Sequence, residues 1–210
     1  MQIEVIRSTD EFERLAEEWN HLLSLSASHV PFLRHEYLSA WWRTRGGGEW
    51  AQAELHIVVA RGNDGALCGI APLFSTTNRD GQRALMLLGS IEISDYLDVI
   101  VKPDHLPGFM NLLLDHLCDP QAPDWDVLDW YNLLESSPSL PALKEAASMR
   151  GLSVNTERLQ HCPYIPLVQL VREAALFTPP GAAARALPSV RVLHPVPAHC
   201  ALTSATPLTT

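Results

Sequence analysis

The stretch ELHIVVARGNDGALCGIAPLF, residues 54–74, carries the clearest signal of tertiary structure in the sequence. It holds two apolar runs, ELHIVVA (54–60) and LCGIAPLF (67–74), separated by Gly62-Asn63-Asp64-Gly65. Glycine and asparagine adopt positive φ readily, so these four residues favour a tight turn. The stretch therefore predicts an antiparallel hairpin in the main sheet.

Upstream of the hairpin, the sequence predicts one short strand and two helices. The strand covers Ile3–Ile6, and Ser8 with Glu11 forms a capping box for the first helix. That helix runs through about Leu25, because apolar residues recur at helical spacing: Phe12, Leu15, Ala16, Trp19, Leu22 and Leu23. The second helix follows Pro31 and ends at Gly46-Gly47-Gly48; its apolar side carries Tyr37, Leu38, Trp41 and Trp42. We expect Leu15, Trp19, Leu38 and Trp41 to be buried.

Downstream of the hairpin, four more strands alternate with two helices. The strands are ALMLLG (84–89), YLDVIV (96–101), DVLDWYN (126–132) and LSVNTERL (152–159). One helix follows Pro107, and the other, around Leu140 to Ala147, stops at Gly151. Each of these helices joins two strands, as parallel crossovers require. Residues 1–167 are thus predicted to form one α/β domain, with a mixed, largely antiparallel sheet flanked by four helices.

The composition changes at residue 168. Residues 168–210 contain six of the sixteen prolines and nine alanines, and they lack Asp, Lys, Asn, Tyr and Trp. Proline interrupts helices, so we expect an irregular, Pro/Ala-rich tail that packs little against residues 1–167. A GC-rich gene read out of frame gives such an alphabet, so the tail is interpreted as a frameshift or truncation product, with a natural linker as the alternative.

The net charge, the hydropathy and the spacing of cysteine and histidine exclude several kinds of partner and site. Fifteen Lys and Arg against 24 Asp and Glu give a net charge of −9, which repels polyanions, so we expect no nucleic-acid partner. The N-terminus lacks a basic region followed by an apolar one, and no apolar run is long enough to span a membrane, which predicts a cytoplasmic protein. The four cysteines form no CxxC pair, and His105, His116 and His161 lack ligand spacing, so no metal site is expected.

The order of elements, together with several local stretches, resembles the GNAT superfamily of N-acetyltransferases. The stretches are the W-x-x-L of Trp19 and Leu22, PFLRHEYLSAWW (31–42), residues 54–74 and LLGSIEISDYLDVIV (87–101). Within that superfamily they resemble acyltransferases associated with bacterial cellulose biosynthesis, relatives of the Fem-like enzymes with two tandem GNAT-like domains. The resemblance covers about residues 5–167. It implies transfer of an acyl group from acetyl-CoA or another acyl-CoA to an amine or hydroxyl of a small molecule or polysaccharide precursor.

In that family a second domain carries the acyl-CoA site, and we expect it to be missing from this chain. The residues agree with this expectation. RTRGGG (43–48) has the letters of a phosphate loop, but it follows a helix, so we interpret it as a helix stop, with a phosphate loop as the alternative. KPDHLPG (102–108) precedes a helix, but its two prolines lack amide donors. Whether the chain is an enzyme therefore stays open, and the alternative is a non-catalytic GNAT-like binding or pairing module.

The acceptor-side candidates lie in Ser94-Asp95-Tyr96-Leu97-Asp98. On an extended segment, alternation points Tyr96 and Asp98 to one face and Asp95 to the other. The resemblance raises Asp95, Tyr96 and Asp98 as substrate-binding residues, and for Asp98 a structural hydrogen bond is the alternative. The sequence indicates no catalytic residue.

Overall fold

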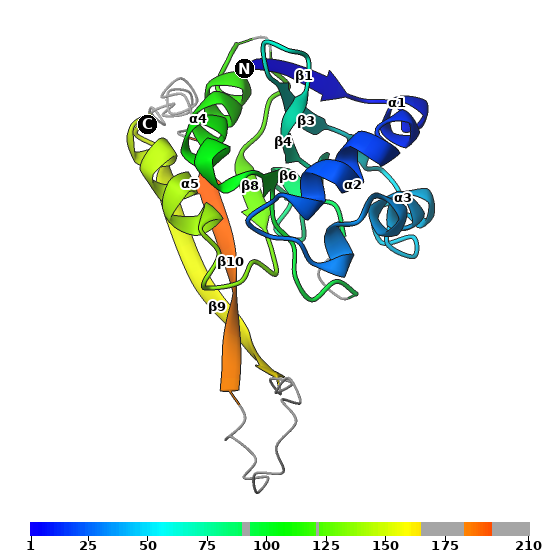
Figure 1. Ribbon diagram of the computed structural model, residues 1–210. Helices are drawn as coiled ribbons and strands as arrows, with labels where there is room; N and C mark the ends of the chain where they lie inside the picture. Colours follow the sequence, from blue (N-terminus) through cyan, green and yellow to red (C-terminus); the bar gives the residue numbers. More distant parts are fainter. Residues whose placement is uncertain (90–92, 121, 165–182, 195–210) are drawn as a thin grey trace, which may run out of the picture.

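The computed structural model describes residues 1–89, 93–120, 122–164 and 183–194. Figure 1 shows α4 and α5 on one side of the central strands and α1 to α3 on the other. The α-helices are α1 (Thr9–Arg14), α2 (Ala16–Ser24), α3 (His35–Thr44), α4 (Leu106–Leu117) and α5 (Ser139–Ser148). Two short 3₁₀ turns, Pro31–Leu33 and Pro103–His105, precede α3 and α4. None of the helices in the described residues is long and apolar enough to cross a membrane.

The strands form two sheets, in which antiparallel pairs predominate. The first has the order β1 (Gln2–Ile6), β3 (Ile57–Arg61), β4 (Leu67–Ala71) and β7 (Ile100–Val101). The second has the order β2 (Glu54–Leu55), β5 (Leu73–Thr77), β6 (Arg83–Leu87), β8 (Val127–Trp130), β10 (Ala183–Leu193) and β9 (Ser153–Tyr164). The predicted mixed α/β architecture is confirmed.

The predicted hairpin is present, and it is divided between the two sheets at Pro72 and His56. β3 and β4 pair antiparallel, and the Gly62 amide donates to Ala66 O at 2.8 Å across the turn. Pro72 has no amide hydrogen, so the ladder breaks there and opposite it at His56. The His56 amide donates to Leu73 O at 3.0 Å, which joins the two halves. One hairpin therefore supplies β3 and β4 to one sheet and β2 and β5 to the other.

The first predicted helix is divided at Leu15 into α1 and α2. Its capping box is present: the Ser8 side chain accepts from the Glu11 amide, and the Glu11 carboxylate accepts from the Ser8 amide. All four residues expected in the core are buried: Leu15, Trp19, Leu38 and Trp41. The Trp19 indole also donates to Leu33 O at 2.9 Å, so this helix is fixed to the turn before α3.

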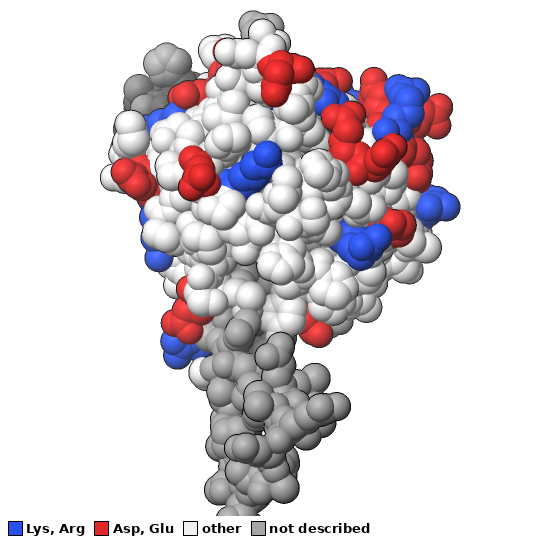
Figure 2. Space-filling view, in the orientation of Figure 1, with Lys and Arg blue, Asp and Glu red and all other residues white. Residues whose placement is uncertain are grey.

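Charged side chains of both signs lie interspersed over α1 and α2 in the view of Figure 2. Arg61 on β3 contributes to this pattern, since it pairs with Glu18 at 2.6 Å and with Glu4 at 3.4 Å. One arginine is therefore shared between two glutamates at this end of the molecule.

Helix α4 forms a parallel crossover between β6 and β8. The two strands pair parallel, with Ala84 opposite Val127 and Leu85 opposite Leu128. The helix approaches β4 closely at Gly69, where an added Cβ atom would clash with the Phe109 ring. Glycine at this position lets the helix lie directly on the strand.

Residues 183–194 depart from the predicted irregular tail. They form β10, which lies between β8 and β9 and is antiparallel to both. Val190 and Val192 are buried in the core, and Arg191 between them pairs with Asp129 at 2.9 Å. The reason is local alternation in SVRVL (189–193), which the Pro/Ala content of the whole segment conceals. The expected boundary at residues 167 and 168, and the remainder of the tail, lie outside the described residues.

Candidate functional site

The predicted acceptor segment is not a strand where its site residues lie. β7 begins only at Ile100, and residues 93–99 have no ladder partner among the described strands. The expected alternation of Tyr96 and Asp98 therefore does not apply, because it requires an extended strand.

Asp98 lies in the interior of the protein. Its Oδ2 accepts from the hydroxyls of Ser28 and Ser137, each at 2.5 Å, and its Oδ1 accepts from the Val99 amide at 2.8 Å. Burial raises the pKa of the Asp98 carboxyl, and the hydrogen bonds from the serines act in the opposite direction. This carboxylate holds three segments of the chain together.

Asp95 and Tyr96 lie nearer the surface than Asp98. Asp95 is exposed, and Tyr96 is half-buried with its ring centroid 6.2 Å from that of Phe32. Phe32 also contacts Tyr37, whose hydroxyl donates to Ile93 O at 2.7 Å. The structure thus places Tyr96 beside the turn that precedes α3, and it does not bring Asp95 and Tyr96 onto one surface with the buried Asp98.

The same segment closes the space beyond the paired part of β6 and β8. The Leu97 amide donates to Asn132 O at 2.9 Å, and the Asn132 side-chain amide donates to Ser94 O at 2.6 Å. Leu97 is buried, and its side chain packs so closely on Gly89 that an added Cβ atom would meet it. Leu97 therefore lies between the residues that follow β6 and those that follow β8.

Two stretches were candidates for a phosphate loop, and each has its own local bonding. In RTRGGG (43–48), Arg45 adopts the left-handed conformation that ends α3, and the amides of Gly46 and Gly48 donate to Trp41 O and Thr44 O. The stretch is the predicted helix stop. At the start of α4, Pro107 lacks a donor, and the Met1 side chain lies over Gly108.

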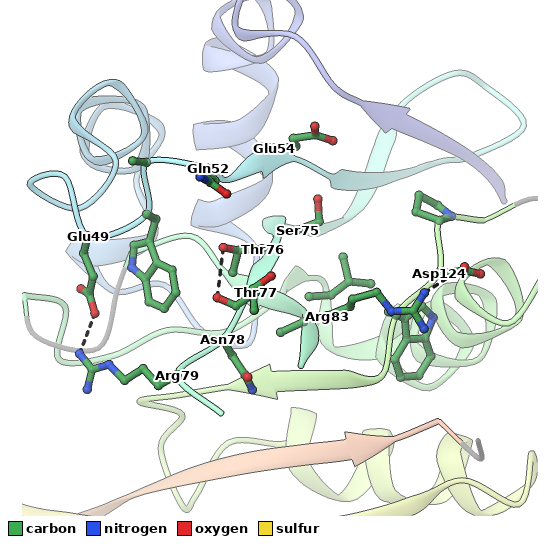
Figure 3. A pocket seen from close by; sticks show the side chains of 16 residues that line it. Glu49, Gln52, Glu54, Ser75, Thr76, Thr77, Asn78, Arg79, Arg83 and Asp124 are labelled. Atoms are coloured by element: carbon green, nitrogen blue, oxygen red, sulfur yellow. Dashed lines mark hydrogen bonds and ion pairs between the residues drawn. The ribbon is translucent and has the colours of Figure 1, made fainter. Parts of the chain in front are cut away.

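A groove of about 600 Å³, which no sequence pattern predicted, lies on the second sheet (Figure 3). It is lined by the chain leading into β2, by β5 and the turn after it, by the start of β6 and by the residues before β8. These are residues 49–52, Glu54, residues 75–79, residues 83–85 and residues 123–125. The signal in the sequence is Ser75-Thr76-Thr77-Asn78, a polar run directly after the buried Leu73-Phe74.

Two ion pairs lie along this groove, and Glu54 on β2 is a further charged residue of its lining. Arg79 pairs with Glu49 at 2.6 Å, and Arg83 pairs with Asp124 at 2.9 Å. Glu54 is exposed and lies directly opposite Ser75 in the register of β2 and β5. It also lines a smaller hollow of about 270 Å³ beside Arg7 and Arg45.

A buried histidine, His56, lies between β2 and β3 in the chain. His56 stacks on His116 with ring centroids 6.4 Å apart, and its Nδ1 is 3.4 Å from the Arg7 guanidinium. Burial, then the charges of Arg7 and His116, lower the pKa of His56 to about 4. Among the described residues, no group of three or more His, Cys, Asp or Glu side chains could hold a metal ion.

No known family model and no curated protein matches the chain. Solved structures similar to it include a GNAT superfamily phosphinothricin acetyltransferase from Sinorhizobium meliloti, crystallised with AcCoA. It is 14% identical with a TM-score of 0.44, and the match covers 92% of this chain and 89% of that one. A spermidine N-acetyltransferase from Vibrio cholerae, crystallised with CoA and spermine, is 11% identical with a TM-score of 0.43. That match covers 91% of this chain and 94% of the other.

Proposed function

We propose that this chain is an acyltransferase-family protein of the GNAT type. The observation that carries the proposal is the element order: an antiparallel hairpin is followed by the parallel unit β6–α4–β8. This is the order behind the family resemblance of the sequence. Relatives of that kind transfer an acyl group from acyl-CoA to an amine or hydroxyl, so we propose a small-molecule or polysaccharide-precursor acceptor and a cytoplasmic location.

We infer that the described domain does not hold acyl-CoA in the usual way. A pyrophosphate needs several backbone amides pointing at it from a loop and a helix N-terminus. Here the amides of Gly46 and Gly48 are used within their turn, and Pro107 removes one from the start of α4. The donor site would then belong to a second domain.

A second candidate function is a non-catalytic GNAT-like binding or pairing module. The observation that favours it is the closed region between β6 and β8, where Leu97 bonds to Asn132 and packs on Gly89. An acyl group would have to displace this buried segment before it could lie between the strands.

Isothermal titration of the full chain with acetyl-CoA tests whether this chain holds an acyl donor by itself. Without a donor site in this chain, we expect no heat of binding up to about millimolar acetyl-CoA. Binding with a Kd of about tens of micromolar would overturn the binding-module candidate and show that this chain holds its own donor.

The proposal of a second, donor-binding domain is tested by the gene. We propose that the first domain includes β10 and so reaches residue 194, because Val190 and Val192 belong to its core. This packing favours the alternative of a natural segment over a frame change after Leu167, and the nucleotide sequence decides between the two. If the frame changes near the codon for Leu167, an alternative frame downstream should encode a strand, a Q/R-x-x-G-x-G/A loop and a helix. If neither alternative frame does so, the frameshift interpretation is wrong.

A further inference from the structure

We propose that the smaller hollow, beside Arg7 and Arg45, binds a hydrogen phosphate ion through two guanidinium groups and one carboxylate. The hollow has a volume of about 270 Å³ and is lined by residues after β1, the first residue of α1, the end of α3 and β2. It contains no residue of the Leu97 segment or of the start of α4. The proposal concerns the side chain of Arg45, not the backbone amides of residues 43–48, so it holds whether or not the chain binds acyl-CoA.

The charged side chains of the hollow leave two guanidinium groups open to an anion. Three residues of its lining are charged: Arg7, Arg45 and Glu54. In the part of the chain that the structure describes, no carboxylate forms an ion pair with either arginine. The neighbouring His56 adds no positive charge near neutral pH, because its pKa is about 4. Two positive charges and one negative charge therefore give the hollow a net positive charge.

Arg45 is held in place without a carboxylate partner. Its guanidinium group lies 3.3 Å from the centre of the Trp42 ring and donates to the Trp42 carbonyl oxygen. Burial lowers the pKa of Arg45, because its charge is partly removed from water. Its φ of 51° is also a conformation that glycine adopts with less strain, and strained residues of this kind cluster at ligand-binding sites. An anion bound to this guanidinium group would offset the cost of its desolvation.

Arg7 and Thr9 can also donate to an anion in the hollow. His56 Nδ1 lies 3.4 Å from Arg7 Nη1, so the neutral histidine accepts from the guanidinium group and orients it. The Thr9 hydroxyl accepts from the Trp42 indole at 3.3 Å, which leaves its own proton available for a ligand oxygen. Two arginines and one hydroxyl supply donors for several oxygens of a tetrahedral anion.

Glu54 selects a phosphate that keeps a proton. Its exposed carboxylate lines the same hollow as the two arginines. This carboxylate repels an anion that has no proton, but it accepts a hydrogen bond from the hydroxyl of hydrogen phosphate. Inorganic phosphate retains a proton at neutral pH, whereas sulfate has none and a phosphate monoester loses its last proton at about pH 6. We therefore expect the hollow to distinguish these anions, although their size and shape are similar.

Isothermal titration of the full chain with sodium phosphate, and with sodium sulfate at the same ionic strength, tests the proposal at about pH 8. We expect phosphate to bind with a Kd of about 1 mM or lower and sulfate to bind at least about tenfold more weakly. Glycerol phosphate separates the free ion from an ester, and we expect it to bind as weakly as sulfate. No heat from phosphate up to about 10 mM, or equal affinities for the three anions, would overturn the proposal.

Arginine variants locate the site. Arg45→Gly and Arg7→Gln should each weaken phosphate binding about tenfold or more, because each removes a charge-assisted donor. Glycine suits the φ of residue 45, so we expect Arg45→Gly to fold, which circular dichroism verifies. Arg14→Gln is the matched control, since Arg14 is an exposed arginine of α1 that does not line the hollow. If Arg45→Gly binds phosphate as the wild type does, Arg45 only ends α3 and the site is wrong.

A glutamate variant tests the recognition of the proton. Glu54→Gln should bind sulfate about tenfold more tightly than the wild type, because the repelling charge is gone, and the preference for phosphate should narrow. Glu17→Gln, at an exposed position on α2 outside the hollow, should keep the wild-type preference. An unchanged preference in Glu54→Gln would mean that Glu54 does not accept from the ion, and the assignment would be wrong.

Discussion

At the level of single residues, Asp98 has a structural role, whereas Asp95 lies on the surface. Asp98→Ala should lower the free energy of unfolding by about 3 kcal/mol, because the Ser28 and Ser137 hydroxyls and the Val99 amide lose their acceptor. The exposed Asp95→Ala should change it by less than about 0.5 kcal/mol. Urea denaturation of both variants measures the difference. Equal, small losses would mean that Asp98 does not hold these segments together.

His56 gives the protein an acid-sensitive residue in its core. Its pKa is lowered from 6.5 to about 4 in the folded state. Between these two pH values, His56 is protonated in the unfolded chain and neutral in the folded protein. This stability is present above pH 6.5 and is lost as the pH falls to 4, by up to about 3 kcal/mol. Denaturation midpoints at pH 7 and pH 5 should differ less in His56→Leu than in the wild type. His21→Gln, at an exposed position, should retain the wild-type difference.

At the element scale, the contact of α4 with β4 depends on a missing side chain. Gly69→Ala should destabilise the protein by about 2–3 kcal/mol, because the new methyl group meets the Phe109 ring. Gly108→Ala is the control, and we expect it to change stability in the opposite direction. Gly108 lies in α4, where the new methyl group meets only the end of the Met1 side chain. This change should stabilise by about 0.5–1 kcal/mol. Thermal midpoints moving in the same direction would contradict this account.

Local signals predicted most elements, and long-range contacts decided the rest. The glycines around Asn63 and the Ser8–Glu11 box act within a few residues, so the hairpin and the first helix start were predictable. By contrast, YLDVIV has the apolar content of a strand, yet its first half is held by Asn132, far along the chain. No local pattern contains such a partner. The groove was missed for the same reason, since Glu54 and Asp124 meet it from distant segments.

At the scale of the whole molecule, Arg191 ties the C-terminal strand to the sheet. It pairs with the buried Asp129 at 2.9 Å and with Asp80 at 2.7 Å. Arg191→Met should cost about 2–3 kcal/mol in unfolding free energy, because Asp129 would keep a buried charge without its partner. Arg158→Met, which breaks the exposed pair with Glu135, should cost less than about 0.5 kcal/mol. If the two arginine variants are equally stable in guanidinium, β10 is not held by this pair.

The position of β10 also fixes when the protein can fold during synthesis. β8 and β9 flank it on either side, although both precede it in the chain. A ribosome therefore releases residues 127–164 before the strand that must lie between them has been made. Until residue 194 has left the exit tunnel, the nascent chain exposes the edges of β8 and β9, which can pair with other chains. β10 completes the middle of the sheet only after both of its neighbours have emerged, so the growing polypeptide has an interval in which chaperone binding would protect it.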